Sequence, residues 1–275
     1  MLALQIIVFL IVGSISGFIA GLLGIGGGII IVPSLFFTLN LLGFNPEDIM
    51  YFSTSTALAS MLLTTLASFV LHQRKKGIEW ELIKRMAFGL VCGVFLAIFP
   101  GHVFSGRFLQ LLFGFFLVFN GFQFIFSFLP QKKTKQGETK LPSYFSASMI
   151  SLIIGFFSVV LGIAGGLFVG QYFNFKQIET RKAISTASSA SFLITLSSCL
   201  FYVFFHTHFI QHTTNSSFFF GPIYLPAFSV ISVSSMLTTF FGVHLIYSID
   251  ISKARKLFGG FCILMGVTMF IKAFI

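Results

Sequence analysis

Charged residues are scarce in this chain, and acidic residues are the scarcest of them. Only 9% of the 275 residues are charged, with 17 Lys and Arg against 7 Asp and Glu, whereas 56% are hydrophobic. The mean hydropathy is +0.98. A soluble domain carries roughly 25% charged residues, so this composition excludes one. It is typical of a polytopic membrane protein, which is embedded in the lipid bilayer and contacts lipid over much of its surface.

Cysteine is also rare, and its placement argues against metal or disulfide chemistry. Cys92, Cys199 and Cys262 are isolated in apolar stretches, without Cys-x-x-Cys or Cys/His spacing. A His-x-His sequence at His206 and His208 could bind a metal, but no carboxylate or thiol is near, and an exposed loop is the favoured interpretation. We expect neither a metal nor a cofactor.

Long apolar runs dominate what is present. Six uninterrupted stretches are long enough to cross about 30 Å of hydrocarbon as helices. Two segments remain, 2–39 and 143–175. A straight helix over 2–39 would be roughly 57 Å long, too long for one crossing. The six stretches are 51–71, 82–100, 107–129, 183–205, 223–246 and 257–274.

The two remaining segments share a glycine pattern. Gly24-Ile-Gly-Gly-Gly28 in one half matches Gly162-Ile-Ala-Gly-Gly166 in the other, in segments 17–28 and 155–166. Matched glycine-broken helices in two halves of a membrane protein indicate discontinuous helices near the bilayer midplane, where transporters bind substrate. The alternative is a pair of tight turns that only allow close helix packing. We expect each segment to form a hairpin that enters and leaves on one side.

The cations indicate orientation. The net charge of +10 lies in short loops rather than on one polar face, which argues against nucleic acid binding. If 72–85 is cytoplasmic, alternation of the spans places 15 of the 17 Lys and Arg on that side, as the positive-inside rule requires. Both termini are then outside, and the polar linker 131–141 is cytoplasmic.

The expected fold is an all-α polytopic membrane protein with two inverted-topology repeats. Each repeat holds one glycine-broken hairpin and three transmembrane helices, an odd number of full crossings that inverts the second half. The repeats are 1–130 and 142–275, joined by the linker 131–141 in one integral membrane domain.

Two kinds of group in matched positions are candidates for binding a small anionic substrate. A half-helix that begins inside the membrane offers unpaired amides and the positive end of its dipole. Hydroxyl clusters open the helices after each break, although such hydroxyls also bond to their own helix or join helices together. The candidates are the glycines Gly26, Gly27, Gly28, Gly165 and Gly166, and the hydroxyl residues Ser53, Thr54, Thr56, Ser185, Thr186 and Ser188.

Carboxylates are almost absent at membrane depth, so no buried sodium cage or proton relay is visible. Glu47 and Glu179 precede the two hydroxyl clusters at equal spacing, which makes them candidates for coupling to a proton or an ion. The favoured alternative is that each carboxylate complements the dipole at a helix start.

At these residues the chain resembles the TauE/SafE family of sulfite exporters, also called the four-toluene-sulfonate uptake permease family. The resemblance is carried by Gly24–Gly28 followed by Val32-Pro33, the Ser/Thr-rich segment 53–56, the basic turn 72–77, and the same order from Gly155. It implies an inner-membrane protein of about eight helical segments that moves small sulfur-containing anions.

The second half departs from the pattern at two positions. Ala164 stands where the first half has Gly26, and Gln171 stands where it has Pro33. Gln171 is therefore a further candidate for contact with the substrate.

The predicted function is a secondary transporter that moves sulfite, thiosulfate or an organosulfonate by alternating access, with homo-oligomerisation left open. An alternative is a membrane scaffold in which the glycines serve packing alone. A membrane-embedded enzyme is less favoured, because no nucleophile and base pair occurs within the spans.

Overall fold

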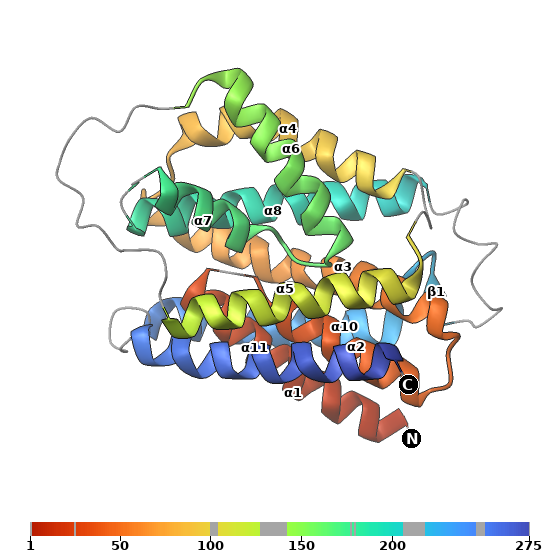
Figure 1. Ribbon diagram of the computed structural model, residues 1–275. Coiled ribbons are helices and arrows are strands. Elements are labelled where there is room, and N and C mark those ends of the chain that lie inside the picture. The colour runs from red at the N-terminus through yellow and green to blue at the C-terminus, as the bar shows by residue number, and fades with distance from the viewer. Residues whose placement is uncertain are drawn as a thin grey trace.

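The structure, a computed structural model, describes residues 2–24, 26–99, 104–126, 142–176, 178, 180–205, 218–245 and 251–274. These residues form ten helices and one short antiparallel hairpin, and the labelled N- and C-termini lie at the same end of the molecule (Figure 1). The elements are α1 (Leu2–Leu23), α2 (Gly28–Leu41), α3 (Pro46–Arg74), α4 (Trp80–Ile98), α5 (Gly106–Phe126), α6 (Tyr144–Val160), α7 (Gly166–Phe175), α8 (Thr180–Phe204), β1 (Phe219–Phe220), β2 (Ile223–Tyr224), α10 (Leu225–Leu245) and α11 (Ile251–Phe274).

Six of the described helices are long and apolar enough to cross a membrane: α1, α3, α5, α8, α10 and α11. Five of them, α3, α5, α8, α10 and α11, overlap stretches expected from the sequence. The sixth expected stretch, 82–100, corresponds to α4, which begins at Trp80 and is not among these six because its first turns carry Glu81, Lys84 and Arg85. Its place among the six is taken by α1. The chain is a multi-span, all-helical membrane protein.

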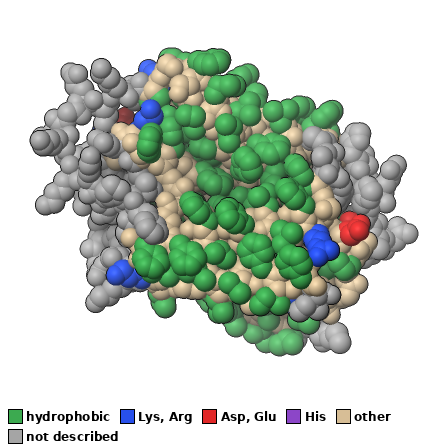
Figure 2. All heavy atoms as spheres, in the orientation of Figure 1, with side chains coloured by type: hydrophobic (Ala, Val, Ile, Leu, Met, Phe, Trp, Pro, Cys, Tyr) green, Lys and Arg blue, Asp and Glu red, His purple; other side chains and the backbone are tan. Residues whose placement is uncertain are grey.

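The surface agrees with a membrane environment. Large apolar side chains such as Phe88, Phe145 and Leu257 are exposed. On the face shown in Figure 2, hydrophobic side chains cover the middle of the molecule, and the coloured charged side chains lie towards its two ends. An apolar belt between charged ends suits a surface that contacts hydrocarbon and reaches the interface only at its rims.

Three helix pairs pack through glycines that let backbones approach closely. Gly17 and Gly21 of α1 face Ser235 and Thr239 of α10 in the same order, so these two helices run parallel. In α4, Gly89 faces Ser148 of α6 and Gly93 faces Leu152, again in parallel. Small residues at such contacts are the usual basis of helix association in lipid, where apolar burial gives little advantage.

The third pair, α5 and α11, is antiparallel. Gly114 faces Gly266, and Gly121 faces Gly259, so each contact joins a glycine to the backbone of another glycine. All four positions lack a side chain, and the two helix backbones are in direct contact along two turns.

Each glycine break reverses the chain, as the hairpin interpretation predicts. α1 begins at the end of the molecule where both labelled termini lie (Figure 1). α2 ends there too, because Asn40 Oδ1 near its last residue lies 3.4 Å from Lys272 Nζ near the C-terminus. In the second half, α6 runs parallel to α4, and after α7 the chain is back beside the start of α4, where Thr186 contacts Glu79.

We predict that Gly121→Leu weakens the α5–α11 contact. A Cβ at this position would lie 2.6 Å from Ile263 Cγ1 and 2.7 Å from the Gly259 oxygen, too close for either atom. Overpacking of this kind costs about 1–3 kcal/mol of unfolding free energy. Thermal unfolding in detergent measures it.

Gly260→Leu is the matched control, because it places the same side chain on α11 at a position with nothing within 4 Å. Equal melting temperatures for the two variants would contradict the assignment of α5–α11 as a tight backbone contact.

Candidate functional site

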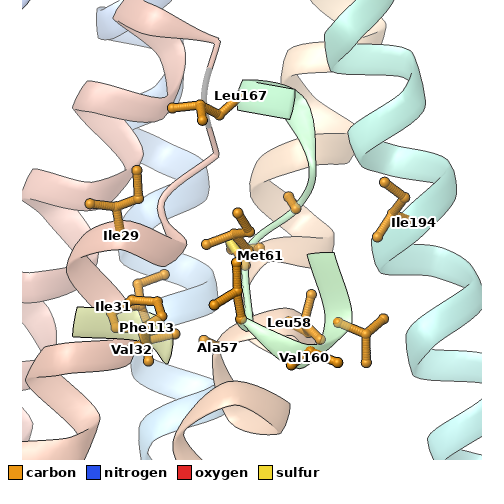
Figure 3. Packing of buried hydrophobic residues seen from close by; sticks show 14 of the residues in the cluster. Ile29, Ile31, Val32, Ala57, Leu58, Met61, Phe113, Val160, Leu167 and Ile194 are labelled. Atoms are coloured by element: carbon orange, nitrogen blue, oxygen red, sulfur yellow. The ribbon is translucent and has the colours of Figure 1, made fainter. Parts of the chain in front are cut away.

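The two glycine breaks meet in the interior of the molecule. A Cβ on Gly26 would lie 3.0 Å from the Ala164 Cβ, and a Cβ on Gly28 would lie 2.6 Å from the Gly162 oxygen. Figure 3 shows Met61 of α3 between the two breaks, with Leu58 and Val160 close by. The start of α2 therefore packs directly on the turn that follows α6.

Backbone conformation explains why glycine stands in both breaks. Gly24 and Gly26 have φ of +66° and +76°, and Gly162 and Gly165 have φ of +64° and +77°. L side chains rarely adopt this left-handed region. The sequence match aligns Gly26 with Ala164, but Gly165 is the residue that takes the second positive φ. The second reversal thus uses one residue more between its two glycines.

The start of α2 presents backbone amides to the interior. Gly27 is the N-cap and makes no side-chain capping bond, and the next residues, Gly28 and Ile29, are buried. The first amides of a helix have no partner within it and lie at the positive end of its dipole. In this part of the chain, the positive potential of α2 therefore falls inside the protein.

A small cavity adjoins the first break, between α1, α3 and α8. The space open to the centre of a water-sized sphere is about 10 Å³, roughly what one water molecule requires. Its described lining includes no charged residue. The lining residues are Ala20, Gly24, Gly26, Thr64, Thr65, Ser68, Ser188 and Ser191.

The lining hydroxyls of Thr64, Thr65, Ser188 and Ser191 are buried and already hydrogen bonded. Thr65 Oγ1 lies 2.8 Å from Thr195 Oγ1, which joins α3 to α8. Ser188 and Ser191 donate to the carbonyls of Ser185 and Ala187, at 2.8 and 2.9 Å within α8. Both carbonyls also accept a backbone hydrogen bond within α8. If either serine rotates its hydroxyl towards a ligand, the carbonyl it leaves therefore still has a hydrogen-bond partner.

Of the residues predicted from the sequence, Gly26 and Ser188 line the cavity. Ser53 and Thr54 instead donate to their own helix, to the Ile49 oxygen at 2.7 Å and the Tyr51 oxygen at 3.0 Å. The expectation that the hydroxyl clusters open their helices is wrong. α3 already begins at Pro46, where Asn45 caps it, and α8 begins at Thr180, so both clusters lie inside helices.

Two predicted threonines fix the starts of other helices. Thr56 Oγ1 accepts a bond of 2.9 Å from the Tyr224 amide just before α10, and Thr186 Oγ1 accepts one of 3.0 Å from the Glu79 amide just before α4. Thr56 and Thr186 therefore have the same role in the two halves, and they are 130 residues apart, as are Thr65 and Thr195.

The structure thus relates α3 to α8 by an offset of 130 residues. The sequence match of Ser53-Thr54 with Ser185-Thr186 gives an offset of 132.

Other predicted residues lie away from the cavity. Gln171 Nε2 donates to Gln123 Oε1 at 2.7 Å and Asn120 Oδ1 at 3.1 Å, which ties α7 to α5. Glu47 is exposed in the first turn of α3. Within the described residues, no cluster of three His, Cys, Asp or Glu side chains is placed to hold a metal. Glu179, His206, His208 and the linker 131–141 lie outside the described residues.

Thr64, Thr65, Ser68 and Ser191 line the cavity but were not predicted. A signal for them exists in the sequence. Thr65 and Ser68 are three residues apart, as are Ser188 and Ser191, and this spacing places both hydroxyls of a pair on one helix face.

Comparison with known proteins identifies the class. The model of the family described as sulfite exporter TauE/SafE matches residues 9–269, so the chain belongs to this family of membrane proteins. A probable membrane transporter protein of Haemophilus influenzae is 26% identical over 97% of this chain and 98% of its own length. A probable membrane transporter protein of Methanocaldococcus jannaschii is 23% identical over 94% of this chain and 93% of its own length.

We predict that Gly162→Ala destabilises the protein more than Gly43→Ala does. Both glycines have positive φ, so each alanine meets backbone strain of about 1–2 kcal/mol. A Cβ on Gly162 would in addition lie 2.6 Å from the Thr54 Cα, whereas Gly43 has nothing within 4 Å. Thermal unfolding of both variants in the same detergent isolates the contact between the second break and α3. Equal losses would contradict it.

Proposed function

We propose that the protein is a secondary transporter of a small sulfur oxyanion, and that the hydroxyl-lined cavity beside the first glycine break is its substrate site. The observation that carries this proposal is that the first glycine break, which ends at the N-cap of α2, meets buried hydroxyls of α3 and α8 around one cavity. Membership of the TauE/SafE family supports the transporter class.

The chemistry of the lining suits an anion that must be released again. Hydrogen-bond donors come from Ser188 and Ser191 after rotation, and the dipole of α2 adds positive potential. Hydrogen bonds from neutral donors to a charged group contribute about 1.5–3 kcal/mol each. With no cation in the described lining, total affinity stays modest, and modest affinity favours passage over capture.

Thr54, Thr56 and Thr186 have a different role in this proposal. Thr54 packs against Gly162, and Thr56 and Thr186 hold the starts of α10 and α4. We assign them to positioning the helices around the cavity rather than to direct substrate contact.

We further propose alternating access between two inverted repeats. Support comes from matched packing, because α1 pairs with α10 as α6 pairs with α4, and α5 pairs with α11 through glycines that face each other antiparallel. The cavity admits about one water molecule, and a sulfur oxyanion is several times larger. Substrate binding in this proposal therefore requires the helices around the break to move apart.

The two sides of the breaks differ in polarity, which supports a conformation closed on one side. Each of three polar lining residues has an apolar residue at the equivalent position of the other helix, 130 residues away. Thr64 of α3 corresponds to Ile194 of α8, and Ser188 and Ser191 of α8 correspond to Leu58 and Met61 of α3. These three apolar side chains are fully buried. We propose that they form the closed barrier on the side where α3 begins, and that the cavity serves the side where α3 ends.

We predict that the end of α3 is cytoplasmic, because the basic turn 74–76 lies there. Gln73 and Ser105 are exposed and are separated by α4, about 28 Å long. In a background without the three native cysteines, an impermeant thiol reagent added to intact cells should label Ser105→Cys and spare Gln73→Cys. Labelling of Gln73→Cys from outside would reverse the proposed orientation.

We predict that the pair Ser188→Ala and Ser191→Ala lowers the affinity for thiosulfate at least tenfold, since two donors to a charged ligand are lost. Ser229→Ala is the control, because that hydroxyl also donates to its own helix, to the Pro226 oxygen, but is exposed on α10. Uptake into proteoliposomes is measured with thiosulfate, sulfite, sulfate, taurine and acetate. Equal flux of all five solutes, or no flux of any, would contradict the function.

A further inference from the structure

His72 is a buried ionisable side chain with an unused hydrogen-bonding atom. It lies in the last turn of α3 and is only 6% exposed. Its Nδ1 lies 3.2 Å from the Ser185 Oγ of α8. Its Nε2 has no hydrogen-bond partner among the described residues. A buried polar atom without a partner costs free energy, so its persistence calls for a functional explanation.

The His72–Ser185 pair lies one helical turn from the cavity. Ser68, which lines the cavity, precedes His72 by four residues on α3, and Ser188, which also lines it, follows Ser185 by three residues on α8. The pair therefore stands between the cavity and the basic turn that follows α3.

The segment after α3 closes over the same pair. A Cβ on Gly77 would lie 2.5 Å from the Ser185 Oγ, so this segment packs directly on the serine. The Glu79 amide then donates to Thr186, and the Glu79 carboxylate pairs with Lys182 of α8. The imidazole therefore lies between the cavity and this end of the protein, one helical turn from the cavity lining on both α3 and α8.

We propose that His72 is the proton-binding group whose protonation is linked to anion binding at this end of the protein. In the protonated form both ring nitrogens donate, one to Ser185 and the other to the passing anion. The proton comes from the solution at that end and returns to it when the anion leaves. This assignment rests on the transport function proposed above.

Electrostatics favours this pairing over a permanently charged site. A buried imidazolium without a counter-ion is strongly disfavoured, and so is a buried anion without a cation, but each compensates the other. By linkage, bound anion raises the proton affinity of His72 and a bound proton raises the anion affinity by the same factor. The described charged or titratable side chains at this end are Arg74, Lys75, Lys76 and Glu79 at and after the end of α3, Glu81, Lys84 and Arg85 in the first turns of α4, Lys182 on α8, and His244 at the end of α10.

The test is thiosulfate binding and uptake at external pH from about 5.5 to about 8, where histidine titrates and thiosulfate keeps its charge. We expect the wild-type dissociation constant to fall by up to about tenfold per pH unit as the pH is lowered, the limit for one linked proton. His72→Gln, which replaces the imidazole by an amide that does not titrate, should lose this dependence. His244→Gln should retain it.

The outcomes separate the two proposals. Absence of thiosulfate binding and flux in the wild type overturns the transport function together with the role of His72. Wild-type flux that does not vary with pH, or the same acid stimulation in His72→Gln, overturns the role of His72 alone. If His72→Gln does not fold, His72→Asn decides instead. It also lacks a titratable ring, so an unchanged pH profile in this variant would contradict the linkage.

Discussion

Direct contact between two reversed backbones is the constraint on which the rest of the structure depends. Gly28 packs against the Gly162 oxygen, and Gly26 packs against Ala164, with no room for larger side chains. Because this contact holds both breaks in the interior, the start of α2 and its uncapped amides lie beside the turn after α6, and Gly24 and Gly26 share the cavity lining with α3 and α8. This backbone contact therefore places the hydroxyls of α3 and α8 beside the break that leads into α2, whose dipole is positive at its start.

The breaks could be predicted from the sequence, whereas the cavity could not. Gly24 and Gly162 carry a local requirement, a backbone conformation that few other residues adopt, and local requirements leave a visible pattern. Thr65 and Thr195 meet because α3 and α8 pack in one particular register. The spacing of Thr65 and Ser68 indicates a shared helix face, but it does not show that Thr65 meets Thr195 while the Thr54 hydroxyl bonds to its own helix.

Two further differences have separate causes. The expected apolar run 82–100 contains Lys84 and Arg85, which the sequence itself shows, and Arg85 pairs with Glu81 in the first turns of α4. Gln171 stands out in the sequence because it replaces a proline, yet its amide bonds to α5. Polar residues at helix ends and between helices follow from tertiary contacts, which a single sequence does not reveal.

The uncharged lining of the cavity has a consequence for evolution. Exchanges among Ser, Thr and Ala at positions such as 188 and 191 add or remove a donor without altering the net charge of the membrane interior. Each intermediate on such a path still inserts into the bilayer, since none carries a new charge at depth. Specificity in such a site can therefore change by single substitutions while the fold and its insertion are preserved.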